Sequence, residues 1–117
     1  MNKIKFSHNW NNKLNNNIFT TIRKYTEEKY IYYTKALENN FEIIVGYGIK
    51  DVRPIRNFKT AILKSVERRY YEDIPYGLLF TDTGMTSREE IKELFRKFGI
   101  ILGTEVIILT FVRTSEY

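Results

Sequence analysis

The sequence predicts an α+β protein built on a small, mostly antiparallel β-sheet or barrel of five to six strands, flanked by two or three helices. Three observations predict this class. The chain has 117 residues, enough for one compact core and too few for two, so we expect a single domain over residues 1–117. One segment, residues 87–98, has the spacing and the end signals of a helix. Segments with β-strand character recur along the chain, at 3–6, 18–24, 41–48, 58–71 and 105–112.

The first part of the chain predicts a strand, a short helix and a second strand. Residues 3–6 alternate polar and apolar side chains, as a half-buried strand does. Ser7 is a good N-cap for a short helix over about residues 8–16, which the asparagines that follow would end. Residues 18–24 then predict a strand because they combine Ile, Phe and Thr, which favour extended backbone.

The middle of the chain predicts two more strands after a connection. Residues 25–40 are rich in Tyr and charge but show no sharp period, so we interpret them as a connecting segment with some strand or turn structure. Residues 41–48 are rich in β-formers and end in glycines. Residues 58–71 predict a long strand, although their period alone does not exclude a helix.

A helix and a buried strand are predicted near the C-terminus. Ser87 and Glu90 form a capping box, in which the serine is the N-cap and the glutamate stands three residues on. Gly99 ends the helix, and residues 105–112 form an apolar, β-branched run typical of a buried strand. The face that we expect to pack consists of four residues at helical spacing, Ile91, Leu94, Phe95 and Phe98.

The composition excludes several classes of site. The chain has no cysteine, which excludes disulfides and thiolate zinc sites, and its one histidine, His8, makes a histidine-based metal site improbable. A carboxylate-only magnesium site stays open but has no motif behind it, so we predict no metal and no cofactor. No apolar run reaches 18 residues and no signal-peptide pattern is seen, so we expect a soluble, cytoplasmic protein without membrane association.

The net charge of +5 is concentrated in the first half of the chain. Residues 1–60 hold 11 Lys and Arg against 5 Asp and Glu, whereas residues 61–117 hold 8 against 9. Basic residues mixed with Tyr, Phe and Trp are typical of proteins that bind single-stranded nucleic acid. The alternative interpretation is a solvated surface of mild positive charge without a specific partner.

The strand at 18–24 carries the most distinctive group of polar side chains. Thr20 and Thr21 offer two hydroxyls, and Arg23 offers a planar guanidinium with five N–H donors. Together these groups suit a phosphate, a carboxylate or the edge of a nucleobase. The structural alternative is that both threonines are simply β-formers, and that Arg23 forms an ion pair with Asp82.

The chain resembles the ASCH domain group of the PUA-like superfamily. The resemblance rests on the opening strand, the Trp10-to-Leu14 helix, the strand Phe19-Thr-Thr-Ile-Arg23, and the closing helix–strand pair that ends in Thr110-Phe-Val-Arg113. It implies a PUA-like β-barrel of five or six strands, with a cleft lined by the Thr-x-Arg strand. It also implies RNA binding or a role in RNA-linked metabolism.

One branch of this group, the small bacterial acetylcytidine amidohydrolases, is similar in length and in the order of its elements. Its motif Lys-Thr-x-Thr-x-Arg places the second threonine on Thr21 and the arginine on Arg23, and a later catalytic Glu corresponds to Asp82. The motif lysine falls on Ile18, which cannot transfer a proton. Lys24 and Lys64 are the candidates to replace it in space.

Two functions follow as expectations. The first is binding of nucleic acid, with RNA expected, or of a modified nucleoside: the arginine would contact a phosphate or base edge, and Asp82 would accept from an exocyclic amine. The second is a small amidohydrolase acting on a modified cytidine, with Thr21 and Asp82 catalytic. The missing lysine favours binding, and a protein partner stays open without a positive signal. The expected binding residues are Thr20, Thr21, Arg23, Lys24, Lys64 and Asp82.

Overall fold

The computed structural model describes residues 3–6, 17–40, 42–47 and 56–113. Each strand overlaps a segment that the sequence predicted as extended, whereas the helix predicted over 8–16 lies outside the described residues. A 3₁₀ turn, Tyr71–Asp73, leads from β4 towards α2. The elements are β1 (Lys3–Phe6), β2 (Ile18–Lys24), α1 (Glu27–Asn39), β3 (Glu42–Tyr47), β4 (Arg56–Tyr70), α2 (Tyr76–Thr83), α3 (Arg88–Lys97) and β5 (Glu105–Arg113).

The strands form one open sheet in the order β1-β3-β4-β5-β2. The pairs β3–β4, β4–β5 and β5–β2 are antiparallel, whereas β1 pairs with β3 in parallel. The expected PUA-like barrel is therefore wrong for the described residues. A barrel needs its first and last strands to pair, whereas here β1 and β2 stand at opposite ends of the strand order.

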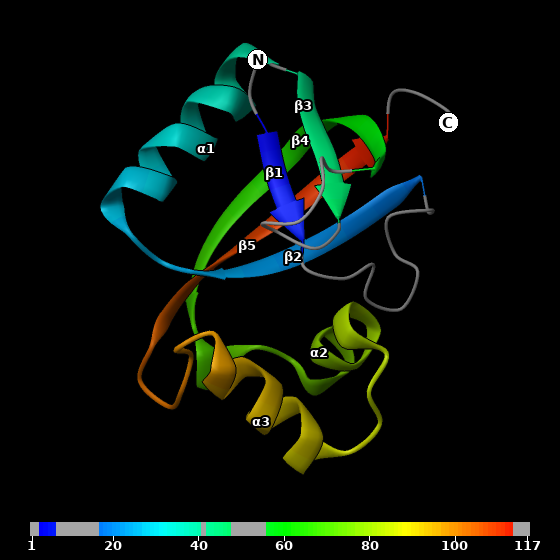
Figure 1. Cartoon of the computed structure of the whole chain (residues 1–117). Coiled ribbons are helices and arrows are strands. Elements are labelled where there is room, and N and C mark those ends of the chain that lie inside the picture. The colour runs from blue at the N-terminus through cyan, green and yellow to red at the C-terminus, as the bar shows by residue number, and fades with distance from the viewer. Residues whose placement is uncertain (1–2, 7–16, 41, 48–55, 114–117) are drawn as a thin grey trace.

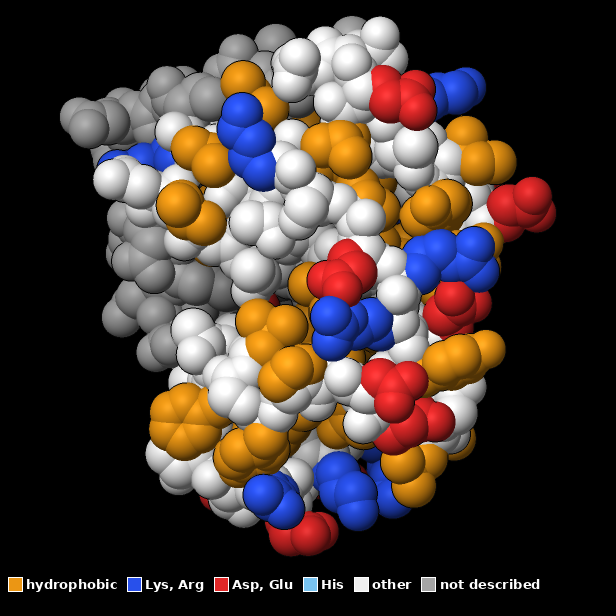
Figure 2. Space-filling model, turned by 180° about the vertical axis from the view of Figure 1, so that it is seen from behind, with side chains coloured by type: hydrophobic (Ala, Val, Ile, Leu, Met, Phe, Trp, Pro, Cys, Tyr) orange, Lys and Arg blue, Asp and Glu red, His pale blue; other side chains and the backbone are white. Residues whose placement is uncertain are grey.

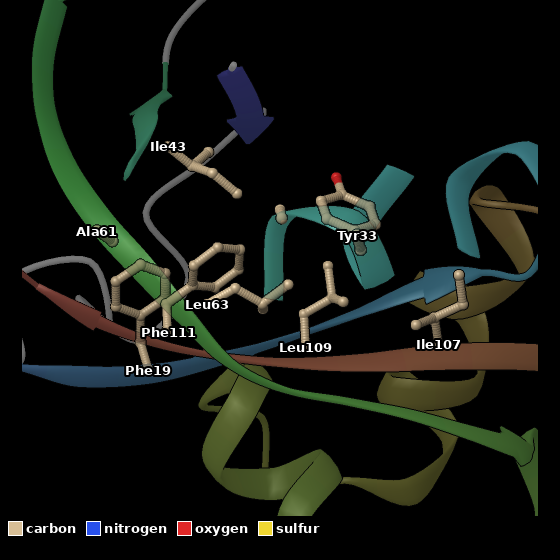
Figure 3. Close-up of a cluster of buried hydrophobic side chains, with 9 residues drawn as sticks. Phe19, Tyr33, Ile43, Ala61, Leu63, Ile107, Leu109 and Phe111 are labelled. Carbon is tan, nitrogen blue, oxygen red and sulfur yellow. The ribbon is translucent and has the colours of Figure 1, made fainter. Parts of the chain in front are cut away.

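Helices cover both faces of this sheet (Figure 1): α1 lies on one side, and α2 and α3 lie on the other. The side chains of β5 alternate between two hydrophobic clusters, as the strand period requires. Ile107, Leu109 and Phe111 point towards α1 and pack there with Phe19 and Tyr33 (Figure 3). Val106 and Ile108 point the other way, into a second cluster whose other buried members are Ile22, Tyr71, Ile74, Leu79, Ile91, Phe95 and Ile100.

Residues 27–39 form helix α1, so the interpretation of 25–40 as strand or turn was wrong. The Thr26 hydroxyl caps the helix by accepting from the Lys29 backbone N–H at 3.1 Å. Glu27 and Glu28 then lie in the first turn, where negative charge is favourable. Only Tyr33 and Ala36 of the helix are buried, so its apolar stripe is too narrow to give a clear period in the sequence.

The predicted helix near the C-terminus is confirmed as α3, with one correction. The Ser87 hydroxyl accepts from the Glu90 backbone N–H, and Gly99 adopts φ 77° just beyond the helix end. Ile91 and Phe95 are buried, whereas Phe98 is 52% exposed. Phe98 is the C-cap residue and lies outside helical geometry, so the spacing that places it on the buried face no longer applies there.

The segment before α3 is itself helical. Thr81, Asp82 and Thr83 form the last turn of α2, and Gly84 ends it with φ 74°. Asp82 and Thr83 are buried there. This helix carries the carboxylate of the predicted site.

Candidate functional site

The alternation of β2 separates the predicted site residues between the two faces of the sheet. Phe19 belongs to the cluster under α1, and Ile22 belongs to the cluster under α2 and α3. Because successive side chains of a strand point to opposite faces, Thr21 and Arg23 lie on the α1 side. Thr20 and Lys24 lie on the α2–α3 side.

On the α1 side, Arg23 is a partly buried guanidinium that Thr21 orients. Its Nε donates to the Oγ1 atom of Thr21 at 3.2 Å, and the Thr21 side chain is itself buried. Burial lowers the pKa of Arg23, while the neighbouring groups Tyr33 and Asp82 raise it. Burial likewise raises the pKa of the Tyr33 phenol, and the charge of Arg23 lowers it. Arg23 and the α1 residue Tyr33 therefore lie near each other in a partly desolvated region.

A second arginine lies in the same cross-strand row. Ile107 of β5 is the register partner of both Arg23 on β2 and Arg68 on β4. The guanidinium carbon of Arg68 lies 4.3 Å from the ring centroid of Tyr25 and 5.2 Å from that of Tyr30. Such distances are typical of cation–π contacts.

An acidic residue holds the second arginine in place. Arg68 donates from Nε and Nη2 to the two carboxylate oxygens of Glu105, at 2.8 and 3.1 Å. This two-point contact fixes the plane of the guanidinium. We call the group formed by Thr21, Arg23, Tyr25, Tyr30, Tyr33 and Arg68 the arginine–tyrosine surface.

On the α2–α3 side, Thr20 holds the buried carboxylate of Asp82. The Thr20 hydroxyl donates to Oδ1 of Asp82 at 3.2 Å, which ties the middle of β2 to the end of α2. Lys24 projects along the same side, and its Nζ lies beside Gly99, where an added Cβ would be 3.4 Å away. An ammonium group at that place lies near the C-terminal end of α3, where positive charge is favourable.

The structure links four of the predicted binding residues in two hydrogen-bonded pairs. Arg23 donates to Thr21 and Thr20 donates to Asp82, and the carboxylate of Asp82 also acts electrostatically on Arg23. The ammonium group of Lys24 lies near the C-terminal end of α3, beside Gly99, and not beside Thr21. Lys64 is exposed at the irregularity in β4, between the paired residues 63 and 65.

The sequence interpretation missed the aromatic half of the arginine–tyrosine surface. Tyr30 and Tyr33 could not be placed there because their segment was not recognised as a helix. The signal was present in Thr26 and the two glutamates after it, which are typical of a helix start. The pairing of Arg68 with Glu105 joins residues 37 positions apart, and no local pattern predicts such a contact.

Within residues 3–6, 17–40, 42–47 and 56–113, no group of three or more acidic or histidine side chains is arranged to hold a metal ion. In the same ranges, no helix has both the length and the apolar character needed to cross a bilayer. Comparison with known proteins found no match to this chain among protein-family models, curated proteins or solved structures.

Proposed function

We propose that this protein binds single-stranded RNA through the arginine–tyrosine surface. In this arrangement Arg23 contacts a phosphate or the edge of a base, and Arg68 with its tyrosines provides a stacking platform. Thr21 acts by orienting Arg23. The ASCH relationship that the sequence suggests is part of the same proposal.

The observation that supports this function best is the burial of Arg23. In a partly desolvated region the attraction between a guanidinium and a phosphate is screened less than in open water, so a contact made there is stronger. Its Nε is directed by the buried hydroxyl of Thr21, so the plane of the donors is set before a ligand arrives. Guanidinium groups fixed in this way suit phosphate and the acceptor edges of bases.

The tyrosines supply the second element of RNA recognition. Tyr25 and Tyr30 are half-buried against the cluster under α1, which restricts their motion. Arg68 covers one ring face of each, so the group is a preformed stack of a cation on aromatic rings. Bases stack on such platforms without strong sequence preference.

We expect this binding to be weak and local instead of driven by a large basic field. On the face shown in Figure 2, Lys and Arg side chains are interspersed with Asp and Glu and with hydrophobic groups. Long-range attraction from such a face is small. If Arg23 is the main phosphate contact, log K should fall with log salt at a slope of roughly −0.7.

Titration of a labelled single-stranded RNA tests the proposal. Fluorescence anisotropy should show binding that weakens from about 50 to 200 mM salt with a slope near this value. Duplex RNA of the same sequence should bind less, because its bases are not available to stack. Absence of binding to single strands at the lower salt concentration would refute RNA recognition and turn attention to a protein partner.

Hydrolysis of a modified cytidine receives less support from the geometry. The proposed pair, Thr21 and Asp82, lies on opposite faces of β2, and Lys24 lies beside Gly99 instead of near Thr21. A threonine nucleophile needs an adjacent base or ammonium. We therefore expect no release of acetate from acetylcytidine; turnover that Thr21→Ala abolishes would reverse this ranking.

A further inference from the structure

A pocket of about 460 Å³ lies between the 3₁₀ turn, α2 and α3, on the side of the sheet opposite the arginine–tyrosine surface. Its volume falls within the range of small-molecule sites, roughly 300–1,000 Å³. The apolar part of its lining includes Ile74, Leu79 and Ile91, which are all buried members of the second hydrophobic cluster. The apolar part of the lining is therefore continuous with the protein core.

Cations line the pocket from α3. Arg88 and Lys92 stand four residues apart and so share one face of that helix. The guanidinium carbon of Arg88 lies 4.6 Å from the ring centroid of Tyr76, another lining residue. The Tyr76 hydroxyl donates to the carbonyl oxygen of Thr86 at 2.8 Å, which fixes the ring on which Arg88 rests.

A carboxylate lines the pocket from a different element. Glu72 belongs to the 3₁₀ turn, and its Oε1 accepts from the backbone N–H of Gly103 at 2.9 Å. This hydrogen bond holds the carboxylate at a defined place on the pocket rim. Glu89, the neighbour of Arg88, adds a second carboxylate to the lining.

We propose that this pocket binds a small zwitterion with an apolar body, of the class of the large apolar amino acids. The lining holds two cations and two carboxylates, so a ligand of a single charge meets as many like charges as opposite ones. A zwitterion pairs its carboxylate with Arg88 or Lys92 and its ammonium with Glu72, while its apolar body covers Leu79 and Ile91. The proposal is independent of RNA binding.

Three probes that share a phenyl ring separate the contributions. L-phenylalanine carries both charges, phenylacetate carries only the negative one, and phenethylamine carries only the positive one. We expect amide NMR shifts of Leu79 and Ile91 on titration up to about 20 mM, a range that detects millimolar affinity. Phenylalanine should bind about 2–5-fold more tightly than either singly charged probe, because each exposed ion pair is worth little.

Two substitutions should each weaken the binding of a different singly charged probe. Arg88→Gln should weaken phenylalanine and phenylacetate by about 2–5-fold and leave phenethylamine unchanged. Glu72→Gln should weaken phenylalanine and phenethylamine and spare phenylacetate. Arg96→Gln is the control, because Arg96 is exposed on α3 and does not line the pocket. Equal affinity for all three probes, or no shift of the pocket amides, would overturn the proposal.

Discussion

At the scale of single residues, two adjacent threonines of β2 have different roles. Thr20 and Thr21 are adjacent in β2, yet Thr20 donates to Asp82 on the α2 side and Thr21 accepts from Arg23 on the α1 side. The first contact joins two elements within the fold. The second orients a cation that is costly to bury. We therefore assign Thr20 a structural role and Thr21 a role in positioning Arg23.

Thr20→Val tests the structural role, because valine keeps the shape and removes the hydroxyl. The change leaves the buried carboxylate of Asp82 without this donor, so the free energy of unfolding should fall by about 1–3 kcal/mol in urea denaturation. Thr86→Val is the control, since Thr86 is exposed in the segment between α2 and α3; it should change stability by less than about 0.5 kcal/mol. A similarly small change in Thr20→Val would mean that the contact does not stabilise the fold.

Glu72 should make the fold less stable as the pH falls into the acid range. The hydrogen bond from the Gly103 backbone N–H, followed by that from its own backbone N–H, lowers the pKa of Glu72 below its ordinary value of 4.5. A carboxyl with a depressed folded-state pKa stabilises the fold above its unfolded pKa and loses that contribution as pH falls through the folded-state value. Denaturation midpoints of wild type and Glu72→Gln, measured between about pH 3 and pH 7, should converge at the acid end. A difference that grows towards low pH would contradict the assignment.

At the scale of elements, the helices that cover the two faces of the sheet differ in the residues that they bury. α3 buries Ile91 and Phe95 and exposes a charged opposite face, whereas α1 buries only Tyr33 and Ala36. This difference explains what the sequence could predict. The capping box and helical spacing of α3 are local signals, and so are the β-branched runs of β4 and β5. α1 depends more than α3 does on contact with the sheet to be helical. In its own sequence, the signal of a helix is the start at Thr26.

The docking of α3 is tested by two phenylalanines three residues apart. Phe95 is 4% exposed, whereas Phe98 is 52% exposed. Phe95→Ala should lower the free energy of unfolding by about 3–5 kcal/mol, because it leaves a cavity in the second cluster. Phe98→Ala should cost less than about 0.5 kcal/mol. Equal losses for both variants in chemical denaturation would mean that α3 packs by a different face.

At the scale of the whole molecule, one sheet separates two candidate binding regions. The arginine–tyrosine surface lies under and beside α1, and the pocket lined by Arg88 and Glu72 lies between α2, α3 and the 3₁₀ turn. The sequence predicted Thr21 and Arg23 as site residues because they are neighbours along one strand. It also named Asp82, which accepts from Thr20 and acts electrostatically on Arg23. It could not place Lys24, because the face on which a side chain lies depends on the register and on the helices that cover the sheet.

The central claim is that Arg23 serves a ligand, and one comparison tests it directly. Arg23→Met should weaken single-stranded RNA binding by at least about tenfold, since a charge-assisted contact is lost. Arg96→Met, which removes an exposed cation from α3 on the opposite side of the sheet, should leave the affinity unchanged. RNA affinity in Arg23→Met equal to that of the wild type, measured on folded protein, would contradict the account.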